Sequence, residues 1–122
     1  MEITPERVIA LAPNEVFVFG SNPQGHHGGG AALIAYREFG AVWGEGRGHH
    51  GSTYAIDTMS GLDVLADEAR TFLAYAAAHP ELRFLLTPVG CGIAGYRPEQ
   101  VAPLFADLPS HVTVPRSFVP FL

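Results

Sequence analysis

The sequence predicts a compact α/β fold in which a mixed, partly parallel sheet is flanked by helices. Two observations predict this class. Short apolar runs alternate with helix-forming segments along the chain, and the runs at 16–19 and 83–87 are each followed by a glycine-rich loop and then by a helical pattern. Such alternation is typical of layered folds with parallel neighbouring strands. The 122 residues are expected to form one domain, 1–122, and a hydrophobic content of 48% supplies a single core.

The first half of the chain contains a strand, a loop and a helix in succession. Val16–Phe19 is rich in β-branched and aromatic residues, as expected of a strand that is buried on both faces. After a loop, residues 31–39 favour a helix that ends at Gly40. Half of residues 44–51 are glycine, so regular structure is not expected there. A second strand is predicted at 53–58.

The second half of the chain begins with the longest predicted helix. Ser60 and Asp63 have the spacing of a capping box, and apolar residues then recur at helical spacing until the helix ends near His79 and Pro80. Residues 83–87 predict a third strand. A helix that starts at Pro98 and a last strand at 111–114 follow, and the chain ends in an apolar tail, 115–122.

The composition excludes several chemistries. All seven basic residues are arginine, so a Schiff-base lysine and the lysine of a P-loop are both absent. The net charge of −5 gives no broad basic surface for nucleic acid. A single cysteine, Cys91, excludes an internal disulfide and a cysteine-based zinc cluster. Without a basic leader or a run of 18 apolar residues, the chain is expected to be cytoplasmic and free of membrane contact.

The two glycine-rich loops, 20–30 and 88–96, are the first feature that indicates a function. In a parallel sheet, loops that follow strands and precede helices meet at the carboxyl edge, where ligands bind. A glycine-rich turn that leads into a helix also exposes backbone N–H groups at the positive end of the helix dipole, which suits phosphate. A pair of such loops is better suited to a diphosphate than to one phosphate. The alternative is that the glycines only permit tight turns.

Two motifs in these loops resemble the macrodomain family. In the first, a strand leads to Asn22, and after a short gap Gly28–Gly30 open a helix of small residues. In the second, Thr87–Tyr96 resembles the second macrodomain loop, especially in the branch with Gly-Cys-Gly at this place, which includes the terminal ADP-ribose glycohydrolase. Tyr54–Thr58 is similar to the strand before the middle helix of that fold. The resemblance covers most of residues 15–114 and implies a three-layer macrodomain-like fold.

The resemblance implies binding of ADP-ribose or a related nucleotide diphosphate, free or attached to a macromolecule. It places the terminal ribose at Asn22, the diphosphate between the two loops and the distal ribose under Tyr96. The ligand-binding residues expected on this basis are Gly20, Ser21, Asn22, Gly28, Gly29, Gly30, Gly90, Cys91, Gly92, Ile93, Ala94, Gly95 and Tyr96. No cofactor is expected.

The chain departs from the family at its catalytic positions. Ala32 stands where one hydrolytic class carries a water-activating aspartate, and Ala94 lies near the place of the aspartate in the glycohydrolase branch, which also uses a lysine. The acidic residue that contacts adenine in the family has no match among Glu2, Glu6 and Glu15. We therefore expect an ADP-ribose reader or scavenger without strong catalysis.

A hydrolase that uses histidine as general acid or base is the alternative function. Four of the six histidines form the doublets His26-His27 and His49-His50, and the ordinary pKa of histidine suits proton transfer near neutral pH. His27, the closest to the glycines, is expected to face the terminal ribose, unless it only shapes the turn. The candidate catalytic residues are His27, His49, His50 and Asp57. No metal site is expected, because the spacing fits no zinc pattern.

Two further interpretations remain open on the sequence. Cys91 is either a nucleophile or a small packing residue beneath its loop. The apolar tail at Phe118–Leu122 either covers an edge of the sheet or serves a structural or partner-binding module that binds no nucleotide.

Overall fold

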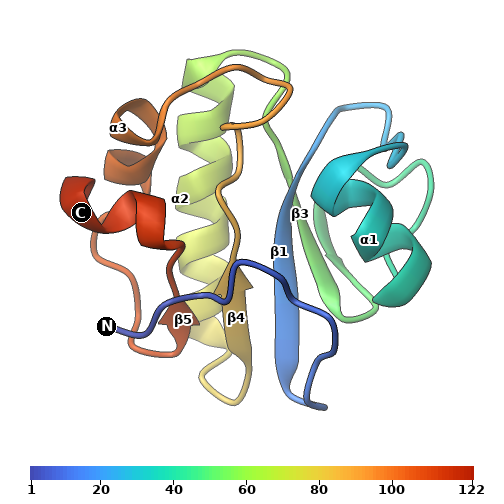
Figure 1. The fold of residues 1–122 in the computed structure, drawn as a ribbon, viewed down its shortest axis with the longest axis horizontal. Helices are drawn as coiled ribbons and strands as arrows, with labels where there is room; N and C mark the ends of the chain where they lie inside the picture. Colours follow the sequence, from blue (N-terminus) through green and yellow to red (C-terminus); the bar gives the residue numbers. More distant parts are fainter.

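The computed structural model describes residues 1–122 as a five-stranded sheet with helices on both faces (Figure 1). The order across the sheet is β2-β3-β1-β4-β5. Parallel pairs join β1 to β3, β1 to β4, and β4 to β5, whereas β2 pairs with β3 in the antiparallel direction. The strands are β1 (Glu15–Ser21), β2 (Gly48–His50), β3 (Thr53–Asp57), β4 (Arg83–Leu86) and β5 (Val112–Thr113). The predicted α/β class with a mixed, partly parallel sheet is confirmed, and three of the four strand pairs are parallel.

The helices lie in two layers. One face of the sheet is covered by α1 together with the N-terminal segment, and the other by α2 and the C-terminal helices (Figure 1). The helices are α1 (Gly30–Glu38), α2 (Leu62–Ala78), α3 (Pro98–Val101) and the 3₁₀ helices η1 (Ala102–Phe105) and η2 (Arg116–Phe121). None of these helices is long and apolar enough to span a bilayer.

The alternation of side chains along β1 divides the core in two. Val16 and Val18 face α2 and belong to the larger cluster, which also contains Phe72 and Phe84. Phe17 and Phe19 face α1 and form the smaller cluster with alanines and Phe39 of that layer. Because successive side chains of a strand point to opposite faces, a continuous apolar run is the pattern that both layers require.

Two expectations for the middle of the chain are wrong. Residues 44–51 include a strand, β2, because Gly51, with a φ of 58°, makes the tight turn that folds Gly48–His50 back onto β3. The capping box at Ser60 does not form either. Gly61 precedes the first residue of α2, and the Ser60 hydroxyl instead donates to Asp57 Oδ2 at 2.6 Å.

The helix and the strand near the C-terminus are shorter than the sequence predicts. The expected helix from Pro98 consists of one turn of α-helix followed by the 3₁₀ helix η1, since Pro103 lacks the N–H that would continue α-helical bonding. The last strand is limited to Val112–Thr113, with an isolated bridge between Val114 and Ile3. The apolar tail forms η2 and places Phe118 in the larger core cluster, so it packs within the domain.

Packing around Phe72 provides a test of the larger core cluster. Its ring is fully buried and lies 5.1 Å from that of Tyr54 and 5.5 Å from that of Phe84. We expect Phe72→Ala to lower the free energy of unfolding by about 3–5 kcal/mol, because the truncation removes these contacts and leaves a cavity. Urea denaturation measures the loss. The exposed neighbour Thr71→Ala is the control, and equal midpoints for the two variants would contradict the packing described.

The pH dependence of the free energy of unfolding in alkaline solution provides a second test. Burial, and then the Glu68 carboxylate and Tyr75, raise the pKa of Tyr54 from 10.0 to about 12. The folded protein therefore keeps this proton to a higher pH than the unfolded chain, so stability is lost as the pH rises through that interval. Tyr54→Phe should decline less steeply between about pH 10 and pH 12 in urea titrations. An identical slope for the variant and the parent protein would refute this linkage.

Candidate functional site

Three loops meet at the carboxyl edge of the sheet. They follow β1, β3 and β4, at the top of Figure 1, and enclose a cavity of about 730 Å³. The strands concerned are the parallel neighbours at the centre of the sheet, so their carboxyl ends share one edge. The cavity is lined by Gly20, Ser21, Asn22, His26, Gly28, Gly29, Gly30, Ala31, Ala32, Thr58, Met59, Thr87, Pro88, Val89, Gly90, Cys91, Gly92, Ile93 and Ala94.

The ligand-binding residues predicted from the sequence fall almost entirely in this lining. The exceptions are Gly95 and Tyr96, which lie outside it. Tyr96 is half-buried and packs against the larger core cluster, while Gly95, with a φ of 81°, makes the turn that precedes it. Both residues therefore help to fold the second loop without lining the cavity.

The first loop presents free backbone donors to the cavity. The N–H groups of Gly28, Gly29 and Gly30 donate to no other group of the protein, and no acidic side chain lies in the first turn of α1. These groups occupy the N-terminus of a nine-residue helix, where the dipole adds partial positive charge. This end of the cavity is suited to an anion.

The second loop also carries backbone N–H groups that have no partner inside the protein. It is folded by four short-range backbone bonds, among them Cys91 N–H to Pro88 O and Tyr96 N–H to Gly90 O. The N–H groups of Gly92, Ile93 and Ala94 remain without a partner inside the protein, and all three residues line the cavity. Six free donors from two loops thus border one space, which can satisfy several phosphate oxygens.

The side-chain amide of Asn22 forms hydrogen bonds within its own loop. Its side-chain amide donates to His26 O and its carbonyl oxygen accepts from His26 N–H, both at 3.0 Å. Gly25 N–H also donates to Asn22 O, and a side chain at Gly46 would collide with that same oxygen. Asn22 lines the cavity, but its amide group serves mainly to close the loop.

The two histidines of the first doublet lie in opposite environments. His27 is fully buried, and its Nε2 donates to Val42 O at 2.9 Å, with Phe19, Tyr36 and Trp43 around the ring. It does not line the cavity, whereas the exposed His26 does. The expectation that His27 faces a terminal ribose therefore finds no support in its position.

His49 and His50 lie on β2, at an edge of the sheet. His49 Nε2 donates to Gly51 O, and its Nδ1 is 2.5 Å from Tyr75 Oη on α2. His50 Nε2 donates to Arg47 O at 2.9 Å. Neither residue lines the cavity at the carboxyl edge, so these imidazoles serve as polar contacts between β2 and its surroundings.

Asp57 organises the turn between β3 and α2. Its buried carboxylate accepts from Met59 N–H, Ser60 Oγ–H and the Arg47 guanidinium, at 3.0, 2.6 and 3.1 Å. Glu68 of α2 accepts from Asp57 N–H at 3.0 Å. The carboxylate itself is outside the cavity lining, and its bonds hold the adjacent Thr58 and Met59 at the rim.

Cys91 lines the cavity and packs against the larger core cluster. Burial raises the pKa of its thiol, so the neutral thiol is favoured at neutral pH. This environment agrees with the interpretation of Cys91 as a packing residue beneath the loop.

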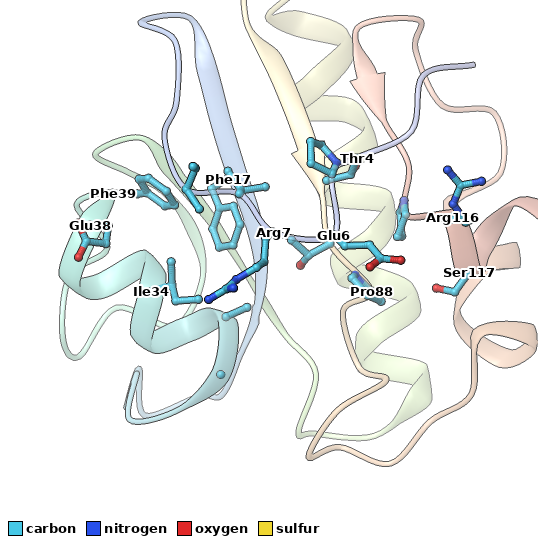
Figure 2. Close-up of a pocket in the computed structure, with 17 residues that line it drawn as sticks. Thr4, Glu6, Arg7, Phe17, Ile34, Glu38, Phe39, Pro88, Arg116 and Ser117 are labelled. Atoms are coloured by element: carbon cyan, nitrogen blue, oxygen red, sulfur yellow. The ribbon is translucent and has the colours of Figure 1, made fainter.

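A second cavity, of about 810 Å³, adjoins the first. The two share Gly30, Ala31, Thr87 and Pro88, and the second extends beneath the N-terminal segment Thr4–Ile9, between α1 and η2. In Figure 2, Arg7 reaches toward Ile34 of α1, and the Glu6 carboxylate is directed toward Pro88. The two cavities therefore adjoin each other, and we call them together the groove.

The sequence interpretation missed several lining residues. Thr58 and Met59 follow β3, and a signal for them existed, since a strand parallel to β1 must end at the same edge. The N-terminal residues of the second cavity carry no such signal, because their position depends on the single bridge between Ile3 and Val114 and on Thr4 hydrogen bonds.

Comparison with protein-family models, with curated proteins and with solved structures finds no match for this chain.

The role of Asp57 is open to a direct test. Asp57→Asn should lower the free energy of unfolding by about 1–3 kcal/mol, because an amide replaces a buried acceptor that serves three donors. Chemical denaturation measures this effect, and Asp67→Asn, whose partner Arg70 is equally exposed, should change stability little. A catalytic Asp57 would give the opposite pattern, with unaltered stability and lost turnover.

Proposed function

We propose that this protein binds ADP-ribose or a closely related nucleotide diphosphate, free or attached to a macromolecule, in the groove at the carboxyl edge of the sheet. The observation that carries the proposal is the set of six unpartnered N–H groups, from Gly28–Gly30 and Gly92–Ala94, around one cavity. A diphosphate presents several oxygen acceptors, which two separate loops can bind together. The chain's net negative charge does not oppose this, since the cavity lining contains no carboxylate.

The adjoining cavity is suited to the nucleoside. We call the cavity between the glycine-rich loops the diphosphate cavity and the adjoining one the nucleoside cavity. The two share Gly30 and Pro88. The lining of the nucleoside cavity includes Phe17, Ile34 and Phe39, which suit a flat apolar base. Glu6 supplies a carboxylate in the same lining, which can accept a hydrogen bond from an exocyclic amine. Glu6 thereby takes the role for which the sequence alone offered no match.

The lining favours binding over hydrolysis. His26 and Cys91 are the titratable side chains among the residues around the diphosphate cavity, and the predicted catalytic set of His27, His49, His50 and Asp57 lies outside it. The protein is therefore best described as a reader or scavenger. The family that we propose for it is the macrodomain family, on the basis of the two loop motifs and the parallel order of β3, β1 and β4.

Calorimetric titration with ADP-ribose, AMP and ribose 5-phosphate tests the proposal. We expect micromolar binding of ADP-ribose and at least tenfold weaker binding of each fragment, because neither fragment reaches both loops and the nucleoside cavity. Equal affinity for AMP and ADP-ribose would restrict the site to the nucleoside. No binding of any of the three would remove the proposal.

A blocking substitution links the affinity to the groove. Ala31 lines both cavities, so Ala31→Trp should place an indole where they join and weaken ADP-ribose binding by about tenfold or more. Ala77→Trp, on the exposed face of α2, is the matched control and should bind as the parent protein does. Thermal melting of both variants checks folding, and unchanged affinity in a folded Ala31→Trp variant would contradict this location.

A further inference from the structure

An exposed aromatic stack adjoins the diphosphate cavity through His26. The His26 and Trp43 rings are nearly parallel, at an interplanar angle of 17° with their centroids 5.4 Å apart. Trp43 is 49% exposed, and the Tyr36 ring, 43% exposed, meets its edge. We call His26 and Trp43 the aromatic platform. The exposed part of the Trp43 indole offers a flat aromatic surface.

Contacts within the protein hold the two rings of the platform in place. The buried His27 ring lies edge-on to Trp43, with centroids 6.2 Å apart, and its Nε2 donates to the carbonyl oxygen of the neighbouring Val42. The loop that carries His26 is fixed to the loop that carries Trp43 by the bond from Gly44 N–H to Gly25 O, at 2.9 Å. The rings are therefore arranged before any ligand arrives, which lowers the entropy cost of stacking on them.

The platform meets the diphosphate cavity through His26. This residue lines the diphosphate cavity and is absent from the lining of the second cavity, whereas Trp43 lines neither. A ligand with its base beside Glu6 and its diphosphate at the glycines directs its second ribose toward His26. Whatever that ribose carries on its anomeric carbon then reaches the platform.

The platform consists of aromatic rings with no arginine between 22 and 29 or between 42 and 46. Aromatic faces attract cations, most strongly when the ring is an indole. A base within a polynucleotide fits less well, because its phosphates would meet a chain of net charge −5 that has no lysine.

We propose that the aromatic platform of His26 and Trp43 is a subsite for the nicotinamide ring of intact NAD⁺, whose positively charged pyridinium is attached to that second ribose. This inference rests on the proposed function, since it requires the diphosphate to occupy the groove. It makes the protein a binder of the whole dinucleotide, with a preference for NAD⁺ over ADP-ribose.

Trp43 reports on its own occupancy, because it is the single tryptophan of the chain. Titration with NAD⁺ should quench its fluorescence, and titration with ADP-ribose should quench it much less. In calorimetry NAD⁺ should bind roughly three- to tenfold more tightly than ADP-ribose, the range expected for a partly exposed cation–π contact.

Two variants attribute the preference to the platform. Trp43→Leu should bring NAD⁺ affinity down to that of ADP-ribose while ADP-ribose affinity stays within about twofold, because Trp43 lies outside the cavity lining. Trp43→Phe should keep part of the preference, because a smaller aromatic face remains. The control is Val42→Ala, a half-exposed neighbour outside the cavity lining, which should preserve the preference in full.

The outcomes separate this inference from the proposed function. Binding of ADP-ribose with equal or weaker binding of NAD⁺ overturns the platform and keeps the proposed function. A preference for NAD⁺ that survives in Trp43→Leu also overturns the platform, since another contact must then supply it. Absence of binding to both ligands overturns the two proposals together.

Discussion

The parallel pairing of β1 with both β3 and β4 is the constraint on which the rest of the structure depends. It places a single strand at the centre of the sheet and brings the carboxyl ends of three strands to one edge. It also requires both faces of β1 to be covered, which Val16 and Val18 achieve toward α2, and Phe17 and Phe19 toward α1. The diphosphate cavity lies at that edge, among the loops that follow these strands.

The groove offers backbone dipoles where another protein would use charged side chains. Free N–H groups at Gly28–Gly30 and Gly92–Ala94 cost no side-chain entropy when they bind, and their positions are fixed by the loops themselves. Glycine serves this purpose because it lets the backbone approach a ligand closely. The proposed anion site therefore depends on local geometry, while the net charge of the chain acts mainly at a distance that salt screens.

Most of the histidines in this protein serve the architecture. His27 is buried between the loops that close the cavity, His49 joins β2 to Tyr75 of α2, and His50 holds the backbone of Arg47. Asp57 plays a comparable part for the turn before α2. These contacts fix the rim of the cavity from outside, so the residues that shape the site and the residues that border it are largely different sets. His26, the exposed member of its doublet, is the exception.

Local patterns were sufficient for the fold class and for the loops of the site. The continuous apolar run at 16–19 required two covered faces, and the glycines after it and after 83–86 could be placed at one edge because parallel strands end together. The strand β2 escaped prediction because a glycine-rich segment has weak intrinsic preference, and its pairing with β3 supplies the order.

The sequence could not show that His26 is the doublet histidine that lines the cavity. Neighbouring residues of a loop point in different directions, and the choice between His26 and His27 depends on Trp43 and Val42, some 15 residues away along the chain. The sequence likewise could not show that Glu6 lines a second cavity. This cavity forms because the N-terminal segment crosses the sheet beside β5. The sequence by itself determined the parallel core and its glycine-rich edge, because these follow from local periodicity. The tertiary structure alone decided which polar groups border the groove, because contacts between distant segments set their directions.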